Sequence, residues 1–305
     1  DLQQHIHAQV IEAVQHRQAV AIQGNNTKAF YGNTCAAQVL SVSGHSGILH
    51  YAPAELVLTA RAGTTLKEIN QCLQQHGQML GFEPPAFAEQ ATIGGTIACN
   101  LSGPRRPYAG AARDFVLGCR IINGHGQIMQ FGGEVMKNVA GYDVARLMAG
   151  ALGTLGVLLE LSIKVLPAPA VERTLVLNLA RDRALQLMRD LARQPAPLSA
   201  ACHVDDRLYV RLSGNAASVT AWEAQIGGDG NDDSGIWQAL RNHTLDFFTS
   251  DRPLWRLSLP PATPRLACEH EVLVDWNRTM LRTLEDRLIA PLQDSVLRGT
   301  MKFRF

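Results

Sequence analysis

Residues Ala91–Gly110 read ATIGGTIACNLSGPRRPYAG, and this run of small residues decides the predicted fold. It opens a glycine-rich region, since 13 of the 26 glycines fall between Gly94 and Gly156. Glycine has no Cβ, so its backbone can adopt positive φ and approach a phosphate or a flat ring closely. Strand-like segments separate these glycines, which distinguishes the region from a flexible linker. The pattern predicts an ordered surface that binds a large cofactor, in preference to a set of unrelated turns.

The composition describes a globular chain with no bias toward charged partners. Its 305 residues are 46% hydrophobic and 18% charged, which is enough apolar material for a core and a length typical of two domains. The net charge is +1 and the basic residues are scattered, so we expect neither nucleic acid nor an anionic membrane surface as a partner. There is no apolar run of about 18 residues and no secretory signal, so we expect no transmembrane segment and a cytoplasmic protein.

Several classes of site lack their sequence pattern. The six cysteines are far apart and form no CxxC pair, so we expect no iron–sulfur cluster, no zinc ribbon and no other metal site. The motifs of zinc hydrolases and of Walker-type nucleotide binding are missing too. The GGTIAC string is not followed by the spacing of a dinucleotide-binding βαβ unit, which leaves NAD as a weak alternative.

Hydrophobic periodicity divides the first 168 residues into two expected subdomains, residues 1–80 and 81–168. In the first, strands alternate with helices, which predicts a small α/β unit. Thr64 or Thr65 is suited to cap its second helix. The elements expected there are a helix over Leu2–Arg17, a strand over Ala19–Ile22, a polar loop over Gly24–Thr27, a strand over Leu56–Arg61 and a helix over Leu66–His76. The second subdomain is expected to be richer in strands, with Val116–Asn123 and Val157–Leu166 as the clearest.

A proline-rich segment, Pro167–Ala170, predicts the boundary of a second domain, because proline cannot continue a central strand. The second domain, residues 169–305, has the alternation of an α+β domain. Its expected elements are a strand over Arg173–Leu179, a helix over Asp182–Arg193, a strand pair around His203–Leu212 and a helix over Ala216–Ile226.

Four ordered motifs carry a specific family resemblance. They are TIGGTIACN (Thr92–Asn100), RDFVLG (Arg113–Gly118), KNVAGYD (Lys137–Asp143) and GALGTLGVLLELSIKVLP (Gly150–Pro167). Together they resemble flavoproteins of the vanillyl-alcohol-oxidase type, and among these the smaller FAD-binding subunits of bacterial glycolate oxidases. The resemblance implies an α+β fold, with a two-subdomain FAD-binding domain followed by an α+β cap domain that contacts substrate or a partner.

The resemblance also implies which residues contact FAD. Two segments would hold the pyrophosphate through backbone amides, namely Gly24, Asn25, Asn26 and Thr27, and Thr92, Ile93, Gly94, Gly95 and Thr96. Near the ring and ribityl chain we expect Ala98, Asn100, Ser102 and Gly103, and near the ADP half Gly153, Thr154, Gly156 and Val157. A side chain at Gly94 or Gly95 would push the backbone away from the ligand.

Two further strings resemble functional motifs of relatives. Ser43–Ser46 (SGHS) resembles a segment that attaches FAD covalently, but it lies well beyond the polar loop. We therefore expect noncovalent FAD and a turn at His45. Gly228–Asn231 (GDGN) resembles the core of a metal and substrate motif, yet no histidine flanks it, so a solvated loop is expected. The family's proline- and glycine-containing C-terminal string is missing from Leu292–Phe305, so this end is expected to be incomplete or diverged.

The catalytic residues are not identified by the sequence, which offers three substrate-side candidates. Arg105 and Arg106 sit between two prolines, where a guanidinium could bind a substrate carboxylate, or equally a partner subunit or an FAD phosphate. Tyr142 could donate a hydrogen bond near the flavin, although a buried tyrosine that satisfies a backbone carbonyl is favoured. Local ion pairs are expected for Arg113 with Asp114, and for Asp143 with Lys137 or Arg146.

By resemblance, the chain is expected to be an FAD subunit of a heteromeric glycolate (2-hydroxy-acid) dehydrogenase or oxidase. Substrate oxidation would deliver a hydride to the flavin, and electrons would leave through a larger flavin subunit and an iron–sulfur subunit. Attachment to the inner membrane would then come from partners. A non-catalytic structural or electron-relay subunit is the alternative, favoured by the missing metal–histidine motif. A free-standing flavin oxidase ranks third.

Overall fold

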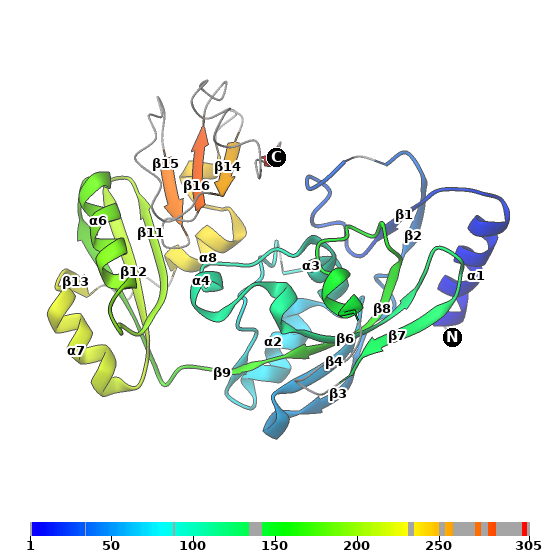
Figure 1. Cartoon of the computed structure of the whole chain (residues 1–305), viewed down its shortest axis with the longest axis horizontal. Helices are drawn as coiled ribbons and strands as arrows, with labels where there is room; N and C mark the ends of the chain where they lie inside the picture. The colour runs from blue at the N-terminus through cyan, green and yellow to red at the C-terminus, as the bar shows by residue number, and fades with distance from the viewer. Residues whose placement is uncertain are drawn as a thin grey trace. The chain divides into compact units, whose positions relative to one another are not determined.

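In a computed structural model of the chain, two units fold around separate cores. The structure describes residues 2–33, 35–87, 89–133, 142–230, 235–249, 254–258, 272–275, 280–284 and 301–303. Unit 1 comprises residues 1–103 and 110–168, and unit 2 comprises residues 104–109 and 169–305 (Figure 1). The chain therefore passes from one unit to the other three times. No helix in the described ranges has the length and apolar character needed to cross a bilayer.

Unit 1 is organised by an antiparallel five-stranded sheet of order β3-β4-β8-β6-β7. Its elements are α1 (Leu2–Gln15), β1 (Val20–Gln23), β2 (Gln38–Ser41), β3 (Ile48–Ala52), η1 (Pro53–Glu55), β4 (Val57–Arg61), α2 (Leu66–Gln74), β5 (Gln78–Met79), α3 (Ile93–Cys99), η2 (Ala112–Phe115), β6 (Val116–Ile122), β7 (Ile128–Gly132), α5 (Val144–Leu147), β8 (Val157–Lys164) and β9 (Leu166–Pro167). The subdomain boundary expected near residue 80 runs through this sheet, because β4 pairs with β8 from Val57–Lys164 to Arg61–Glu160.

Helix α1 covers a small core that β1 and β2 share with the end of the main sheet. β1 and β2 pair in parallel, and Ile6 and Val10 of α1 are buried against residues of β2, β6 and β8. Ile6, Val10 and Val14 recur every four residues in the sequence, which predicts that all three share one buried stripe. Val14 is instead 41% exposed, and Ala13 is buried in its place. Steps of four residues overshoot the helical period of 3.6, so the stripe drifts off the buried face by the third position.

Two threonines begin the helices that follow β4. The hydroxyl of Thr65 accepts a hydrogen bond from the amide of Glu68 at 3.2 Å and caps α2. Thr64, the other candidate, is fully buried, and its hydroxyl binds the carbonyls of Gly47 and Arg61. Thr92 caps α3 in the same way through the amide of Gly95. The segment from Thr92 to Thr96, expected as a loop, is therefore a cap and the first turns of a short helix.

Unit 2 is built on a sheet whose described strands follow the order β13-β10-β12-β11-β15-β16-β14-β17. Its elements are α4 (Arg106–Ala109), β10 (Val171–Asn178), α6 (Arg181–Ala192), β11 (Leu198–Val204), β12 (Arg207–Gly214), α7 (Ala216–Ile226), β13 (Asp229–Gly230), α8 (Gly235–Asn242), η3 (Asp246–Phe248), β14 (Leu254–Ser258), β15 (Val272–Asp275), β16 (Met280–Leu284) and β17 (Met301–Phe303). Asp205 and Asp206 turn the β11–β12 hairpin with φ of +52° and +54°, a geometry that matches the twist of the strands.

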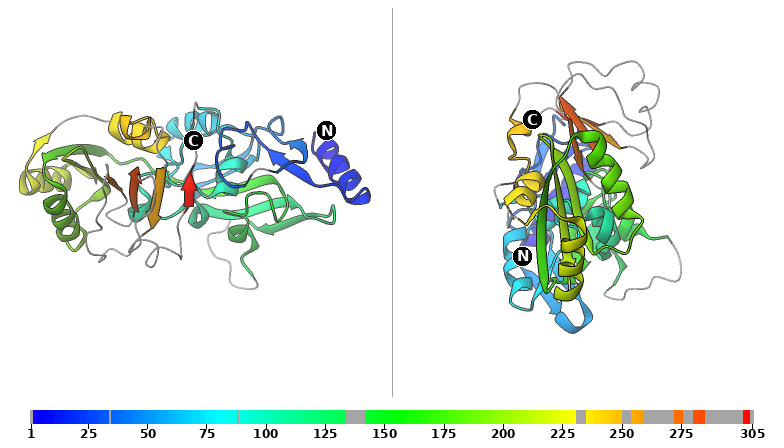
Figure 2. Two further views of the ribbon diagram at one scale, coloured as in Figure 1. Left: turned by 90° about the horizontal axis from the view of Figure 1, so that it is seen from above. Right: turned by 90° about the vertical axis from the view of Figure 1, so that its left-hand side faces the viewer.

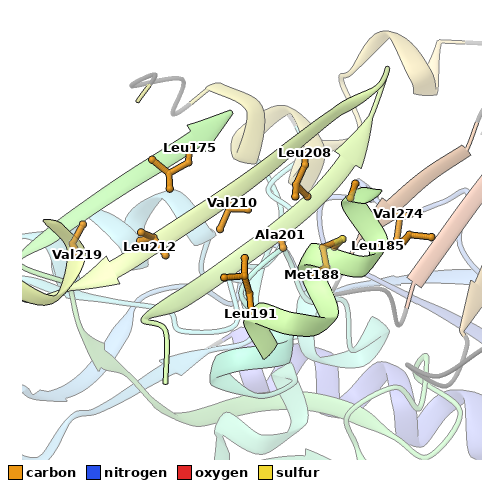
Figure 3. Packing of buried hydrophobic residues seen from close by; sticks show 11 residues of the cluster. Leu175, Leu185, Met188, Leu191, Ala201, Leu208, Val210, Leu212, Val219 and Val274 are labelled. Atoms are coloured by element: carbon orange, nitrogen blue, oxygen red, sulfur yellow. The ribbon is translucent and has the colours of Figure 1, made fainter. Parts of the chain in front are cut away.

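Helices cover both faces of this sheet. Leucines and Met188 of α6 pack with Val219 of α7 on the face that carries Ala201, Leu208 and Val210 (Figure 3). Residues of α8 pack on the opposite face, which carries Ala200 and Cys202. The right-hand view of Figure 2 shows α6 and α8 on opposite sides of the strands. Alternate residues of β11 thus enter two different cores, which explains why six of its seven residues are buried.

The core on the α6 face is expected to set the stability of unit 2. Leu208 is fully buried there, so Leu208→Ala should lower the free energy of unfolding by about 2–5 kcal/mol. Arg207→Ala, at the exposed neighbouring position, is the matched control and should change it little. Chemical denaturation monitored by circular dichroism would measure both. Equal effects of the two substitutions would contradict this assignment of the core.

Candidate functional site

A polar loop at the end of β1 presents backbone amides to solvent. Asn25 and Asn26 are exposed, and Asn26 has a left-handed φ of +55°. No described residue accepts a hydrogen bond from the backbone amides of Asn25, Asn26 or Thr27. Successive free amides in a turn that includes a left-handed residue form a concave site for an anion.

This loop lies against the start of α3. A Cβ added to Gly24 would stand 2.5 Å from Oγ1 of Thr92, so only glycine permits the approach. The side-chain amide of Asn25 donates to the carbonyl of Gln90 at 2.9 Å. Two segments that are about seventy residues apart, both expected at the pyrophosphate, are therefore brought together.

The amides at the start of α3 are already used within unit 1. Ile93 donates to the carbonyl of Thr64 at 2.9 Å, and Gly94 donates to that of Ala62 at 2.8 Å. The amide of Gly95 is taken by the cap and that of Thr96 by the carbonyl of Thr92. Of the two segments expected to offer amides to a pyrophosphate, the first has amides with no acceptor among the described residues. In the second, residues 62–64 accept from the first two amides, and Thr92 accepts from the next two.

The two neighbouring glycines of α3 have different surroundings. A Cβ on Gly94 would stand 2.7 Å from Cβ of Ala62 and 2.8 Å from its carbonyl oxygen, so Gly94 is required by packing within the protein. A Cβ on Gly95 would meet only Oγ1 of Thr92, at 3.2 Å. A side chain at Gly94 would thus meet the end of β4, and the contact of its backbone with FAD stays a prediction. At Gly95 no described atom other than Oγ1 of Thr92 lies within 4 Å of the added Cβ.

A second glycine-rich loop binds the last turn of α3. The amides of Gly150 and Leu152 donate to the carbonyls of Ile97 and Ala98, both at 3.0 Å. Gly153, with φ of +78°, approaches Ile22 of β1. The remaining predicted residues of this loop have local roles: Thr154 binds the carbonyl of Ala151, Gly156 packs on the carbonyl of Ile122, and Val157 begins β8 and is buried.

Residues expected near the flavin ring follow α3 directly. Asn100 ends the helix with φ of +51°, and its Oδ1 accepts a hydrogen bond from the amide of Arg113 at 3.1 Å. The hydroxyl of Ser102 accepts one from the amide of Ala112 at 2.9 Å. Gly103 is buried against the backbone of Glu83, and Ala98 is half-buried. The polar atoms of Asn100 and Ser102 thus hold the segment before β6.

Comparison with known proteins agrees with this arrangement. Residues 3–132 match the model of the FAD binding domain family. Over 293 residues the chain is 46% identical to glycolate oxidase subunit GlcE of Escherichia coli. The aligned region covers 95% of this chain and 83% of that protein. The chain belongs to the GlcE family. Its expected FAD-binding domain and α+β fold class are confirmed.

More distant relatives share only part of the GlcE-family chain. Glycolate oxidase subunit GlcD of Bacillus subtilis is 32% identical over 182 residues, which cover 58% of this chain and 38% of that protein. A solved structure of alkyldihydroxyacetonephosphate synthase aligns with a TM-score of 0.62 over 79% of this chain and 56% of the synthase. At 15% identity that likeness shows a shared fold and nothing more.

Lys28 is a residue of this GlcE-family site that the sequence analysis missed. It directly follows the polar loop, is half-buried, and its Nζ lies 3.4 Å from Oγ1 of Thr27 and 5.7 Å from the centre of the Phe87 ring. Burial lowers the pKa of Lys28, and Cys99 partly offsets this. A lysine one residue after a candidate anion loop was the available signal in the sequence.

Of the substrate-side candidates, Arg105 is already engaged inside unit 2. Its guanidinium lies 2.5 Å from Oε2 of Glu172 and 3.5 Å from the hydroxyl of Ser213, and its side chain is 11% exposed. Arg106 lies at the exposed start of α4. On the same helix, burial followed by a smaller effect of Asp275 raises the pKa of Tyr108, whose enclosed hydroxyl has no hydrogen-bond partner among the described residues.

Tyr142 is 96% exposed, which corrects the expectation of a buried tyrosine that satisfies a backbone carbonyl. The two ion pairs expected from the sequence are confirmed. The guanidinium of Arg113 lies 3.7 Å from the carboxylate of Asp114, and that of Arg146 lies 3.0 Å from the carboxylate of Asp143. The rest of the KNVAGYD motif, residues 137–141, lies outside the described residues.

The two strings that resemble functional motifs have local surroundings. His45 sits in a bend after the turn at Ser43 and Gly44 and is 4% exposed, and burial together with Arg61 lowers its pKa, so the ring is held neutral. Asp229 and Gly230, expected in a solvated loop, form β13 and pair with β10, because Gly228 adopts a φ of +93° beside that strand. Asn231 lies outside the described residues. Within the ranges that the structure covers, no three His, Cys, Asp or Glu residues are placed to hold a metal.

The contrast between the two glycines of α3 is testable. Gly94→Ala should lower the melting temperature of the protein, with or without FAD, because the new Cβ meets the backbone of Ala62. Gly95→Ala should preserve the melting temperature of the cofactor-free protein but reduce its FAD content, because the methyl group occupies the open side of the helix. Differential scanning fluorimetry and flavin absorbance measure the two effects. Full FAD content in Gly95→Ala would show that the ligand does not lie against this residue.

Proposed function

We propose that this chain is the FAD-binding subunit of a heteromeric glycolate (2-hydroxy-acid) dehydrogenase or oxidase. The observation that carries the proposal is the row of free backbone amides at Asn25–Thr27 beside α3. It occurs in a chain related over 95% of its length to a protein named as a glycolate oxidase subunit. Unit 1, residues 1–103 and 110–168, would form the FAD-binding domain, and unit 2, residues 104–109 and 169–305, a cap domain.

The residues present fit FAD. The free amides are suited to a pyrophosphate, and Gly95 has only Oγ1 of Thr92 near its Cβ position. The Gly150–Val157 loop lies against the end of α3 and against Ile22 of β1. We assign the pyrophosphate to Gly24–Thr27 and the segment near Gly95, the ADP half to Gly153–Val157, and the ring side to Ala98–Gly103. The burial of His45, which is 4% exposed, supports noncovalent attachment. Bound FAD would accept electrons from the substrate, and the residues of this chain would bind and orient the FAD.

The proposed partners are a larger flavin subunit, related to GlcD, and an iron–sulfur subunit. The name of the relative as a subunit supports partners of some kind. Electrons from a flavin need an onward acceptor, and the six widely spaced cysteines of this chain provide no cluster ligand set. Attachment to the inner membrane would come through these partners.

A second candidate function is an FAD subunit that relays electrons or supports the assembly without oxidising substrate. Arg105, a candidate for binding a substrate carboxylate, instead contacts Glu172 and Ser213. Tyr142 is open to solvent on nearly its whole surface. These two observations favour the relay role over catalysis by this chain's own residues.

The visible spectrum of the purified chain distinguishes these functions. A flavin subunit should show absorption bands at about 370 and 450 nm, and denaturation should release the flavin from the protein. Anaerobic glycolate should bleach the bands if the chain oxidises the substrate. Unbleached flavin that is reduced only after partner subunits are added would support the relay role. A colourless protein that binds no added FAD would refute both functions.

The role of Arg105 can be separated from substrate binding. Arg105→Met should destabilise unit 2 by about 1–3 kcal/mol, because Glu172 loses its closest charged partner, and should leave FAD content and the KM for glycolate unchanged. Arg106→Met, at the exposed neighbour, is the control and should leave stability unchanged. Thermal denaturation and steady-state kinetics of the complex measure these effects. A large rise in KM for Arg105→Met at unchanged stability would restore Arg105 as a substrate residue.

A further inference from the structure

The ammonium group of Lys28 lies among weak partners. Its described neighbours are the hydroxyl of Thr27 at 3.4 Å and the face of the Phe87 ring, whose centre is 5.7 Å away. The Phe87 ring itself packs edge-on against Phe30 with centroids 5.3 Å apart. A neutral hydroxyl at this distance and an aromatic face compensate an ammonium less than a carboxylate does.

No carboxylate of the described residues balances this charge. Within the described ranges, Lys28 forms no ion pair with any Asp or Glu. The titratable group that acts on it is the thiol of Cys99 at the end of α3, and burial raises the pKa of that thiol, which keeps it uncharged at neutral pH. A partly buried charge without a counter-charge is unfavourable, so such lysines are rare unless a ligand supplies the negative charge.

The position of Lys28 in the chain indicates which group supplies its counter-charge. It follows by one residue the three free amides of Asn25–Thr27, which attract an anion through their N–H groups. Amides fix the geometry of a bound phosphate, and a lysine adds a full positive charge as a point donor. One short loop therefore carries both parts of a phosphate site.

We propose that Lys28 is the counter-charge for the phosphates of the bound dinucleotide, acting together with the amides of Asn25–Thr27 as one anion-binding site. The inference rests on the proposed FAD function and deepens it by naming a binding residue outside the glycine motifs. The ammonium group costs stability in the cofactor-free chain and gains its partner when FAD binds.

This role gives opposite effects on stability and on binding. Lys28→Met keeps the length of the side chain but removes the charge, so the full chain without cofactor should melt at the same or a higher temperature. The same substitution should raise the Kd for FAD roughly 10- to 100-fold, the range expected for a charge-assisted hydrogen bond. Lys28→Arg should retain most of the affinity.

Two controls identify the phosphates as the source of the effect. Riboflavin carries the same ring without phosphate, so its affinity should be equal in the wild-type chain and in Lys28→Met. Lys67→Met removes an exposed lysine that pairs with Glu89 at 3.9 Å, and should change neither FAD nor riboflavin binding. Flavin fluorescence titration of the cofactor-stripped chain gives the Kd for FAD and for riboflavin. Displacement of bound FAD by ADP gives the Kd for a second phosphate-bearing probe.

The outcomes separate this inference from the function on which it rests. FAD binding that is equally tight in the wild-type chain and in Lys28→Met would overturn the role of Lys28 and leave the proposed function standing. A lower melting temperature of cofactor-free Lys28→Met, with equal losses of FAD and riboflavin affinity, would overturn it in favour of a packing role against Phe87. A wild-type chain that binds no FAD would overturn the proposed function itself.

Discussion

Two hydrogen bonds hold the candidate site together, those from the amides of Ile93 and Gly94 to the carbonyls of Thr64 and Ala62. The amide of Ala62 donates in turn to the carbonyl of Leu159 in β8. The start of α3 is therefore anchored to the main sheet through Ala62. The polar loop after β1 and the Gly150 loop both lie against α3. A displacement of the end of β4 would therefore move every segment that we assign to the cofactor.

The periodic elements were predictable from sequence, because their signals are local. The helix over residues 216–226 and the cap at Thr65 depend on side chains within a few positions of each other. The helical state of α3 was missed because two glycines lower helix propensity, whereas the acceptors that hold its first turn come from residues 62–64. Which glycine packs on protein and which faces open space likewise depends on Ala62, and no local pattern reveals that.

The candidate site was predictable as a set of segments but not as a set of roles. Motif resemblance brought together the polar loop, α3 and the Gly150 loop, and these are adjacent in the structure. It could not show that Arg105 forms an ion pair with Glu172, since the two residues are 67 positions apart. Nor could it show the surroundings of Lys28, because a lysine in a loop is solvated in most proteins and only the packing of Phe87 distinguishes this one.

The six residues from Pro104 to Ala109 belong to unit 2, although the chain enters and leaves them from unit 1. Arg105 is engaged there with Glu172, and α4 lies against β11. The C-terminal half is thus not a detachable module that begins at residue 169. Replacing residues 169–305 with those of a relative would therefore leave residues 104–109 of this chain packed against strands from a different sequence. A truncated gene ending at residue 168 would strand an arginine and a tyrosine whose burial depends on the missing half.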